Sequence, residues 1–365
     1  MGSDHPALQF PAPAPSRAGR SARARVLAVT DAFNPTASAV IAALDALGVP
    51  WSRFNQADFP RLQAGFDPLR PEDGVFIDEA GDRIAWGEVA AAWIWHPAPF
   101  RLDNPPGPPG EPARFAAEAC AWACRSILGF LGETAFLVNP PDRSARAGDK
   151  GLQLRAARRL GFSVLETLVT NSPDEALAFC RRHGQVVFKT LNPPRVGRGG
   201  GRSWISTSLL GPRDLDALDG LRQCPGIFQP RLPKRFDLRV TLVGRRVFPV
   251  EIHSQDHGET AVDFRRCWAR GIALDHRVHA LPEVVRDRCL ALARTLGLAY
   301  CALDLVVTPA EDYVFLEVNP SGQYGWIEHA AGLPITRALA ALLAFRDPWR
   351  GDPAPSAPAH ERSLR

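Results

Sequence analysis

Residues 299–328 read AYCALDLVVTPAEDYVFLEVNPSGQYGWIE. The apolar, β-branched segments 301–308 and 313–318 flank four turn-forming residues, which predicts two strands joined by a short turn. Asp304 lies on the first strand, and Glu317 and Asn319 lie two residues apart at the end of the second. Residues two apart in a strand share a face, so Asp304 can meet both from the paired strand. Two carboxylates and an amide oxygen suit Mg²⁺ bound together with nucleotide phosphates. The alternative is a buried Asp and Glu paired with arginines.

Composition restricts the class of protein. A chain of 365 residues with 45% apolar content can form two or three packed subdomains. We find no run of 18 apolar residues and no apolar amino-terminal segment, so we expect neither a membrane span nor a secretory signal. Seven scattered cysteines without CxxC spacing favour a reduced cytoplasm and no zinc site. The net charge of +4 resides in segments 1–25 and 346–365, which argues against a nucleic-acid partner because that requires a folded basic face.

Lysine is rare in this chain. The 43 basic residues are 40 arginines and three lysines, Lys150, Lys189 and Lys234. A compact ammonium group and a planar guanidinium group are not interchangeable at a bound phosphate or in a tight site. The three lysines therefore predict positions where an ammonium is required, with chance survival as the alternative.

The order of the predicted elements indicates an α/β protein. Strands at 25–30, 50–54 and 91–95 and helices at 36–47 and 112–131 describe an open amino-terminal α/β domain without a GxGxxG fingerprint. We expect domains at 25–141, 142–232 and 233–347, disordered tails at 1–24 and 348–365, and a loop at 103–110. The remaining predicted elements are a helix at 142–161, strands at 135–138, 164–170, 185–190, 203–208 and 227–229, a hairpin at 236–243 and 247–252, and helices at 174–183, 282–296 and 333–345.

Residues 195–202, RVGRGGGR, form a glycine-rich and arginine-rich loop between two predicted strands. A P-loop instead runs into a helix and needs GK[ST]. The free N–H groups and arginines of this loop can still fold over phosphates. The alternative is an ordinary mobile hairpin tip.

The order of Lys150, Lys189, the glycine-rich loop, Gln229, Asp304, Glu317 and Asn319 resembles that of an ATP-grasp fold. The resemblance covers about 26–345 and implies an amino-terminal open α/β domain, a central α+β lid and a carboxyl-terminal α+β domain with the metal site. The chain most resembles the microviridin-type (graspetide) ribosomal peptide maturases, which are related to ribosomal-protein glutamate ligases. The motifs that carry the resemblance are FDLRVTLVGRRVFPVEI (236–252), DFR (263–265), FLEVNPSGQYGWIE (315–328) and GLPI (332–335).

The resemblance implies ATP and Mg²⁺ as cofactors, with Mn²⁺ as a substitute. It assigns phosphate contacts to Lys150, Lys189 and the loop residues Arg195, Gly197, Gly199, Gly200 and Gly201. It places an adenine edge against the backbone of Pro230, Arg231 and Leu232, flanked by Gln229 and Lys234. Arg239 would hold the transferred phosphoryl group or the acyl phosphate, Asp263 and Arg265 would lie near the acceptor peptide, and Asp304, Glu317 and Asn319 would hold the metal. Glu251 and Asp263 are both candidates for a general base.

The expected activity is an ATP-dependent, ADP-forming ligase that activates Asp or Glu side chains of a ribosomal precursor peptide as acyl phosphates. Hydroxyl or amine groups then form ester or amide cross-links. The partner would be a precursor with a leader and an acidic core, and the exposed strands of 236–252 would pair with the leader. A homodimer is compatible with this expectation. Two alternatives stay open: a ligase that adds a free amino acid to a protein or small-molecule carboxylate, and a non-catalytic nucleotide-binding regulator.

Two positions depart from the family pattern. Pro230 follows Gln229 where the family usually has Glu, and a proline offers no N–H to adenine. Trp95-His96-Pro97 stands where the family often carries paired arginines. The second departure changes the substrate contacts expected from the amino-terminal domain.

Overall fold

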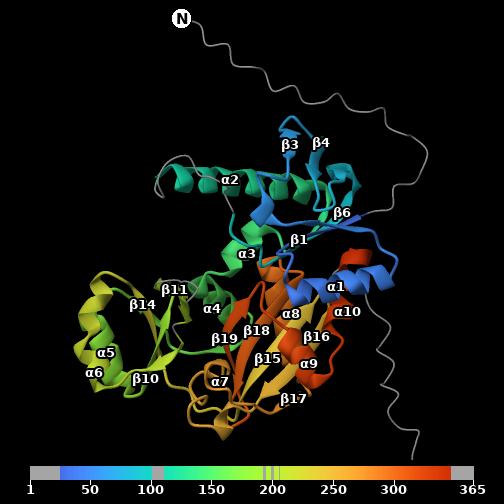
Figure 1. The fold of residues 1–365 in the computed structure, drawn as a ribbon. Coiled ribbons are helices and arrows are strands. Elements are labelled where there is room, and N and C mark those ends of the chain that lie inside the picture. Colours follow the sequence, from blue (N-terminus) through green and yellow to red (C-terminus); the bar gives the residue numbers. More distant parts are fainter. Residues whose placement is uncertain (1–24, 101–110, 192–194, 199–200, 205, 347–365) are drawn as a thin grey trace, which may run out of the picture.

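The computed structural model describes residues 25–100, 111–191, 195–198, 201–204 and 206–346. The predicted tails at 1–24 and 348–365 and the predicted loop at 103–110 lie outside these residues. Within them the chain is a mixed α/β protein built around three larger sheets. Figure 1 shows the amino-terminal sheet with α2 at the top, a small sheet with its helices at the lower left, and a long sheet at the lower right.

A four-stranded parallel sheet of order β2-β1-β6-β7 forms the amino-terminal part. Its sides are covered by different helices: α2 (Glu111–Thr134) on one face, and α1 (Pro35–Ala46) with α10 (Ile335–Phe345) on the other. A parallel sheet covered on both faces needs apolar residues at successive positions, as Val26 and Leu27 show. The strands are β1 (Arg25–Thr30), β2 (Trp51–Phe54), β6 (Val89–Trp95) and β7 (Phe136–Val138).

Between β2 and β6 the chain forms an antiparallel meander that sequence analysis missed. It consists of β3 (Ala64–Asp67), β4 (Arg70–Ile77) and β5 (Arg83–Ala85). Gly74 of β4 lies so close to buried Trp86 that a Cβ atom there would be 2.4 Å from the indole ring. The strands are short and rich in charge, so their apolar alternation is weak.

The second sheet, which we call the lid sheet, has the order β13-β10-β14-β9 and is antiparallel. Helix α5 (Pro173–His183) packs on one face through Phe179 and Phe228, and Ser172 caps this helix. The hairpin of β11 (Arg195–Arg198) and β12 (Gly201–Trp204) follows β10. The other elements are β9 (Leu168–Thr170), β10 (Val186–Thr190), β13 (Ser208–Leu209), β14 (Gly226–Pro230) and α6 (Pro212–Asp216).

Two predicted elements are each divided in the structure. The helix expected at 142–161 is α3 (Pro141–Ala147) and α4 (Lys150–Arg159), because Asp149 accepts the N–H of Leu152 at 2.9 Å and so starts a new helix. The strand expected at 164–170 is β8 (Ser163–Val164) and β9, which belong to different sheets. Short polar side chains such as Asp149 favour caps over helix interiors, which explains the break.

The third sheet is six-stranded, with the order β17-β16-β15-β18-β19-β8. Helices α4 and α8 (Glu283–Leu296) contribute to the core on one face, and α9 (Gly325–Ala331) and α10 contribute to the core on the other. The hairpin predicted at 301–308 and 313–318 is present as β18 and β19. The remaining elements are β15 (Phe236–Val243), β16 (Arg246–Ile252), α7 (Arg266–Arg270), β17 (His276–Val278), β18 (Tyr300–Val307) and β19 (Tyr313–Asn319).

A search of the described residues finds no helix with both the length and the apolar character needed to cross a membrane.

Gln153 attaches α4 to β19. Its Nε2 donates to the carbonyl of Val318 at 2.9 Å, and its Oε1 accepts the N–H of the same residue at 2.9 Å. A further bond runs from Nε2 to the carbonyl of Ala147. Strand β8 pairs with β19 only at Val314 and Phe315, so the buried amide acts as the strand partner farther along.

We predict that Gln153→Leu lowers the free energy of unfolding by about 2–4 kcal/mol, because it leaves buried backbone groups of Val318 unpaired. Chemical denaturation measures the change. Gln185→Leu is the control: Gln185 is exposed and accepts one bond from Arg231, so we expect a change within about 0.5 kcal/mol. Equal losses of unfolding free energy in the two variants would contradict the role of Gln153 as the partner of the Val318 backbone.

Candidate active site

A row of charges lies on one face of the six-stranded sheet. Arg239 on β15 is directly opposite Asp304 on β18, which in turn is opposite Glu317 on β19. Nη1 of Arg239 donates to both oxygens of Asp304, at 2.7 and 2.9 Å. Asn319 Nδ2 donates to Asp304 Oδ2 at 3.0 Å. The structure therefore brings together the three predicted metal ligands, and the alternative of a carboxylate paired with an arginine is realised at Asp304 as well.

Glu317 is surrounded by cations. Lys150 Nζ lies 3.0 Å from its Oε2, and Arg265 Nη1 lies 3.7 Å from its Oε1. Burial alone would raise the pKa of Glu317, but Lys150, Arg265 and Lys189 outweigh it and lower the pKa to about 2. Glu317 is therefore an anion throughout the physiological range.

Asp304 shows the opposite shift. Burial raises its pKa above the usual range, Arg239 lowers it, and the nearby charge of Glu317 raises it again. Two carboxylates on adjacent strands repel each other, and a divalent cation between them would relieve that repulsion. The pair therefore fits a bound metal ion.

Lys189 approaches the cluster from the lid sheet. It pairs with Ile227 and projects from the face opposite α5. Burial lowers its pKa to about 8; the charge of Glu317 opposes this shift, and the charges of Lys150, Arg265 and Lys234 add to it. Within the described part of the chain the Lys189 ammonium has no hydrogen bond. It is a positive charge held among other positive charges, which is the arrangement a polyanion would neutralise.

The three lysines of the chain come together although 84 positions separate the first from the last. Lys150 and Lys234 both lie close enough to Lys189 to lower its pKa. Lys234 is largely buried, and its Nζ donates to Asp237 Oδ1 at 2.8 Å and to the carbonyl of Val262 at 3.0 Å. Lys234 thus ties the end of the lid sheet to the six-stranded sheet.

Gln229 lies near the end of β14 in the lid sheet, and the linker to the six-stranded sheet follows it. The buried amide of Gln229 donates to Thr167 Oγ1 at 2.9 Å, while its Oε1 has no partner among the described residues. The N–H of Arg231 is used by the carbonyl of Gln185 at 2.8 Å, and Pro230 has none. Of residues 230–232, Leu232 therefore has the backbone N–H that is available to an adenine edge. Gln229 Oε1 is an acceptor without a partner among the described residues.

The predicted glycine-rich loop is a paired hairpin rather than an open loop. Arg195 and Gly197 lie on β11, and Gly201 lies on β12. Gly199 and Gly200 fall outside the described residues. The strand predicted at 203–208 is likewise replaced by the end of β12 and by β13.

Asp263 and Arg265 form an ion pair beside Glu317. Arg265 donates to both carboxylate oxygens of Asp263, at 2.8 and 2.9 Å, and the N–H of Thr207 donates at 3.0 Å. Burial would raise the pKa of Asp263, but the bonds and charge of Arg265 outweigh it and lower the pKa. A carboxylate with a lowered pKa and filled lone pairs is a weak general base.

Glu251 does not join the cluster. It pairs with Leu238, whose side chain belongs to the core on the other face of the sheet, whereas Arg239 pairs with Val250. Its carboxylate instead contacts His253 at 3.0 Å and His279 at 2.7 Å. One position along a strand changes the face, so the structure does not bring Glu251 to the charged cluster, and its role as a general base stays an untested prediction.

The prediction that the strands of 236–252 are exposed for peptide pairing is also wrong in part. Strand β15 is paired along both edges, with β16 and β18. Strand β16 is covered by β17 at residues 250–252. The free edge of the sheet at this end is therefore β17.

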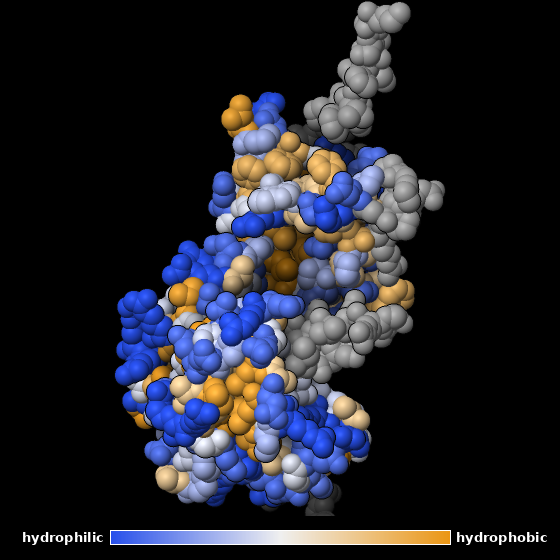
Figure 2. Space-filling view, turned by 90° about the vertical axis from the view of Figure 1, so that its left-hand side faces the viewer, coloured by the Kyte–Doolittle hydropathy of each residue, from blue (hydrophilic) through white to orange (hydrophobic). Residues whose placement is uncertain are grey.

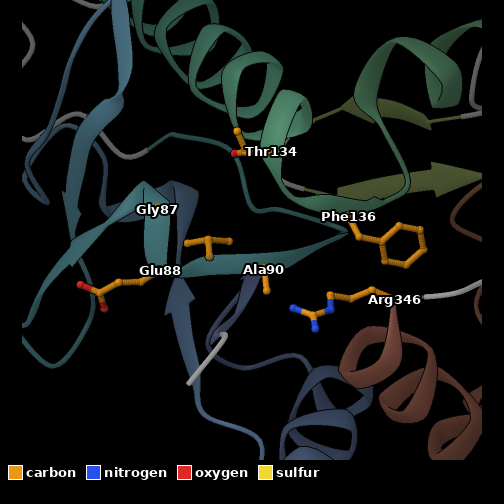
Figure 3. A pocket seen from close by; sticks show the side chains of 7 residues that line it. Gly87, Glu88, Ala90, Thr134, Phe136 and Arg346 are labelled. Atoms are coloured by element: carbon orange, nitrogen blue, oxygen red, sulfur yellow. The ribbon is translucent and has the colours of Figure 1, made fainter. Parts of the chain in front are cut away.

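The molecular surface is hollowed between the lid sheet and the amino-terminal part. Figure 2, which faces the lid side, shows this hollow below the upper part of the molecule, with apolar residues at its floor. A separate cavity of about 510 Å³ lies at the start of β6 and the end of α2. In Figure 3, Glu88 points away from the Arg346 guanidinium, and no predicted site residue lines this cavity. The charged cluster, rather than this cavity, is the candidate active site.

Gln153, which holds α4 against β19 beside the Lys150–Glu317 pair, was not predicted from the sequence. It lies one helical turn after Lys150 and bonds the residue next to Glu317. A glutamine inside a helix is an ordinary residue, so no local signal marks it.

Comparisons with known proteins give structural relatives. No family model matches the sequence, and no curated protein matches it significantly. The macrocyclase MdnC of Microcystis aeruginosa MRC, solved bound with its precursor peptide MdnA, has 28% identity and a TM-score of 0.77, covering 88% of this chain and 99% of that one. A RiPP-associated ATP-grasp ligase of Chryseobacterium gregarium, in complex with ADP and a leader and core peptide, has 26% identity and a TM-score of 0.77, covering 90% and 98%. The ATP-grasp ligase PsnB, complexed with a minimal precursor, Mg and ADP, shares the fold at 21% identity and a TM-score of 0.70, covering 89% and 98%.

The sheets, the lid and the charged cluster define the chain as an ATP-grasp ligase, which confirms the predicted fold class. Within that class the chain is similar over most of its length to ligases that act in ribosomal peptide maturation.

The lowered pKa of Lys189 generates a prediction about nucleotide binding. With a pKa of about 8, Lys189 is partly neutral at pH 8.5, and the phosphates of ATP would raise that pKa. ATP binding should therefore take up a proton at pH 8.5, and affinity should fall by up to about tenfold per pH unit above the pKa. Calorimetry in two buffers of different ionisation enthalpy measures the uptake. Lys189→Met should abolish it; identical enthalpies in both buffers for the unmodified protein would contradict the prediction.

Proposed function

We propose that this ligase uses ATP and Mg²⁺ to join Asp or Glu side chains of a precursor peptide to hydroxyl or amine groups of the same peptide. The observation that carries the proposal is the pair of carboxylates, Asp304 and Glu317, held among four cations that approach from both sheets, from α4 and from the loop before α7. Similarity to ligases solved with precursor peptides supports the substrate class.

Asp304, Glu317 and Asn319 would hold Mg²⁺, which would neutralise phosphate charge during transfer. The described residues contain no group of three or more His, Cys, Asp or Glu arranged around a metal site. Mg²⁺ is octahedral, so two carboxylates and an amide would leave coordination positions for phosphate oxygens. Oxygen ligands suit Mn²⁺ as well, so we propose that Mn²⁺ can replace Mg²⁺.

The chemistry proceeds in two balanced steps. A peptide carboxylate attacks the γ-phosphorus of ATP, which releases ADP and leaves an acyl phosphate. A hydroxyl or amine then attacks the acyl carbon, forms the ester or amide, and releases phosphate and a proton. Lys150 and Lys189 would offset the repulsion between the incoming carboxylate and the phosphates in a site of low dielectric.

Arg265 and Arg239 have different roles in this proposal. The Arg265 side chain is 38% exposed and can reach an acidic substrate, whereas that of Arg239 is 7% exposed and committed to Asp304. We therefore propose that Arg265 binds the acidic core or its acyl phosphate and that Arg239 holds the metal ligand. Asp263, which stays ionised, would act by orienting Arg265.

We propose that the leader adds to the free edge of β17, beside exposed Trp268 and its neighbour Trp326. Main-chain pairing would hold the leader away from the charged cluster. A homodimer stays a prediction, which light scattering in solution tests.

Mass spectrometry of acidic precursor peptides incubated with the protein and Mg²⁺-ATP tests the activity. We expect a loss of about 18 Da per cross-link, the mass of the water removed in condensation. A peptide without its leader should react more slowly. A gain of one amino-acid residue would favour the alternative of a ligase for free amino acids, and no mass change despite tight ATP binding would favour a regulator.

Glu317→Gln should abolish turnover and weaken Mg²⁺-ATP binding, because it removes one of the two carboxylates proposed to hold the metal ion. Calorimetry and ADP release measure both effects. Glu72→Gln, at an exposed position on β4, is the matched control and should leave both unchanged. If Glu317→Gln turns over at nearly the rate of the unmodified protein, Glu317 is not a ligand of the proposed metal site.

A further inference from the structure

The turn that follows the proposed metal ligands is held by side chains at every carbonyl. It comprises Pro320, Ser321, Gly322 and Gln323, directly after Asn319. A backbone turn near the surface usually leaves some of its carbonyls to water, so four side-chain partners indicate a turn that is held in one position. The contacts are Asn139 Nδ2 to Pro320 O at 2.8 Å, His96 Nε2 to Ser321 O at 2.7 Å, the Tyr300 hydroxyl to Gly322 O at 2.5 Å, and Arg239 Nη2 to Gln323 O at 3.3 Å.

The four partners come from two different sheets. Tyr300 and Arg239 belong to the six-stranded sheet, whereas His96 and Asn139 directly follow β6 and β7 of the amino-terminal sheet. The carboxyl ends of parallel strands are where α/β proteins place functional groups. The turn is thus a point at which the amino-terminal sheet is tied to the candidate active site.

His96 has an unusual backbone conformation that serves this contact. Its φ is 44°, in the left-handed region that residues other than glycine rarely adopt. Its ring stands edge-on to buried Trp95 at 4.8 Å, and Trp95 packs in turn against Tyr300. Because a carbonyl can only accept, His96 Nε2 carries the proton in this bond. An uncommon conformation that aims one donor at one acceptor is a feature to test for function.

The 320–323 turn also confines the side chain of Arg239. A Cβ atom added to Gly322 would lie 2.4 Å from Nη2 of Arg239, so the guanidinium packs directly against the backbone of the turn. Arg239 holds Asp304, and Asn319, at the start of the turn, also bonds Asp304. A displaced turn would therefore move two partners of the same carboxylate.

We propose that His96 is a positioning residue: through its bond to Ser321 it sets the 320–323 turn, and with it Arg239 and Asn319, in the geometry that the reaction needs. This inference rests on the proposed function. It gives the amino-terminal sheet a part in catalysis that needs no contact with substrate.

The test compares His96→Phe with His96→Gln. Phenylalanine keeps a flat ring against Trp95 but has no donor, whereas glutamine carries an amide nitrogen at a reach similar to Nε2. We expect His96→Phe to lower kcat by about tenfold with KM for ATP changed less than about twofold, because the loss is one of positioning rather than nucleotide binding. His96→Gln should restore most of kcat.

Hydrogen exchange in the free protein gives a readout that needs no activity. The amides of residue 319 and of residues 321–324 should exchange faster in His96→Phe than in His96→Gln or the unmodified protein. If His96→Phe does not fold, His96→Asn replaces it, since asparagine tolerates positive φ and its shorter amide reaches only the position of Nδ1.

The outcomes separate the two proposals. If the unmodified protein does not turn over acidic peptides, the proposed function is wrong. The hydrogen-exchange comparison would still decide whether His96 holds the turn. Turnover in the unmodified protein together with unchanged kcat and exchange in His96→Phe would overturn the inference. Equal losses in the Phe and Gln variants would also overturn it, because the ring and not the donor would then matter.

Discussion

The buried ion pair between Arg239 and Asp304 is the interaction on which the rest of the site depends. Charges removed from water are tolerated only when they are paired and hydrogen-bonded, and breaking such a pair costs about 3–5 kcal/mol. Register places the two residues opposite each other on β15 and β18, and the pair then constrains its neighbours. Asn319 bonds the same carboxylate, and Gln323 accepts from the same guanidinium. One ion pair therefore connects the central strands, the proposed metal ligands and the turn after them.

Charge distribution explains why this site should bind a polyanion. The carboxylates lie on the six-stranded sheet, while Lys189 comes from the lid sheet, Lys150 from the start of α4 and Arg265 from the loop before α7. Burial together with neighbouring cations leaves Lys189 with a pKa lowered to about 8. A triphosphate with its metal ion would satisfy cations from both sheets at once, so its binding would help to hold the lid sheet against the six-stranded sheet. Excluding water from such a cleft would also protect an acyl phosphate from hydrolysis.

Sequence patterns predicted the parts of the site that depend on local spacing. Two apolar, β-branched segments around a turn within 299–328 predicted the β18–β19 hairpin, and the rarity of lysine singled out three residues that the structure gathers. The failures have physical causes. Glu251 was expected near the site. The two residues between β15 and β16 instead set a register that puts Arg239 opposite Val250, so Glu251 lies on the other face of the sheet. The helix at 142–161 was predicted as one element because its periodicity continues past the Asp149 cap. The contacts of His96 and Asn139 with the turn had no local signal, since their partners lie 225 and 181 positions away; His96 stood out only as a departure from the family pattern.

The central claim is that this site converts a peptide carboxylate into an acyl phosphate at the expense of ATP. The most direct measurement uses a precursor peptide whose Asp and Glu side chains are labelled with oxygen-18, with mass analysis of the phosphate released. If the carboxylate attacks the γ-phosphorus, one labelled oxygen leaves with phosphate for each cross-link formed, because the C–O bond breaks in the second step. Cross-linked peptide accompanied by unlabelled phosphate would contradict the account.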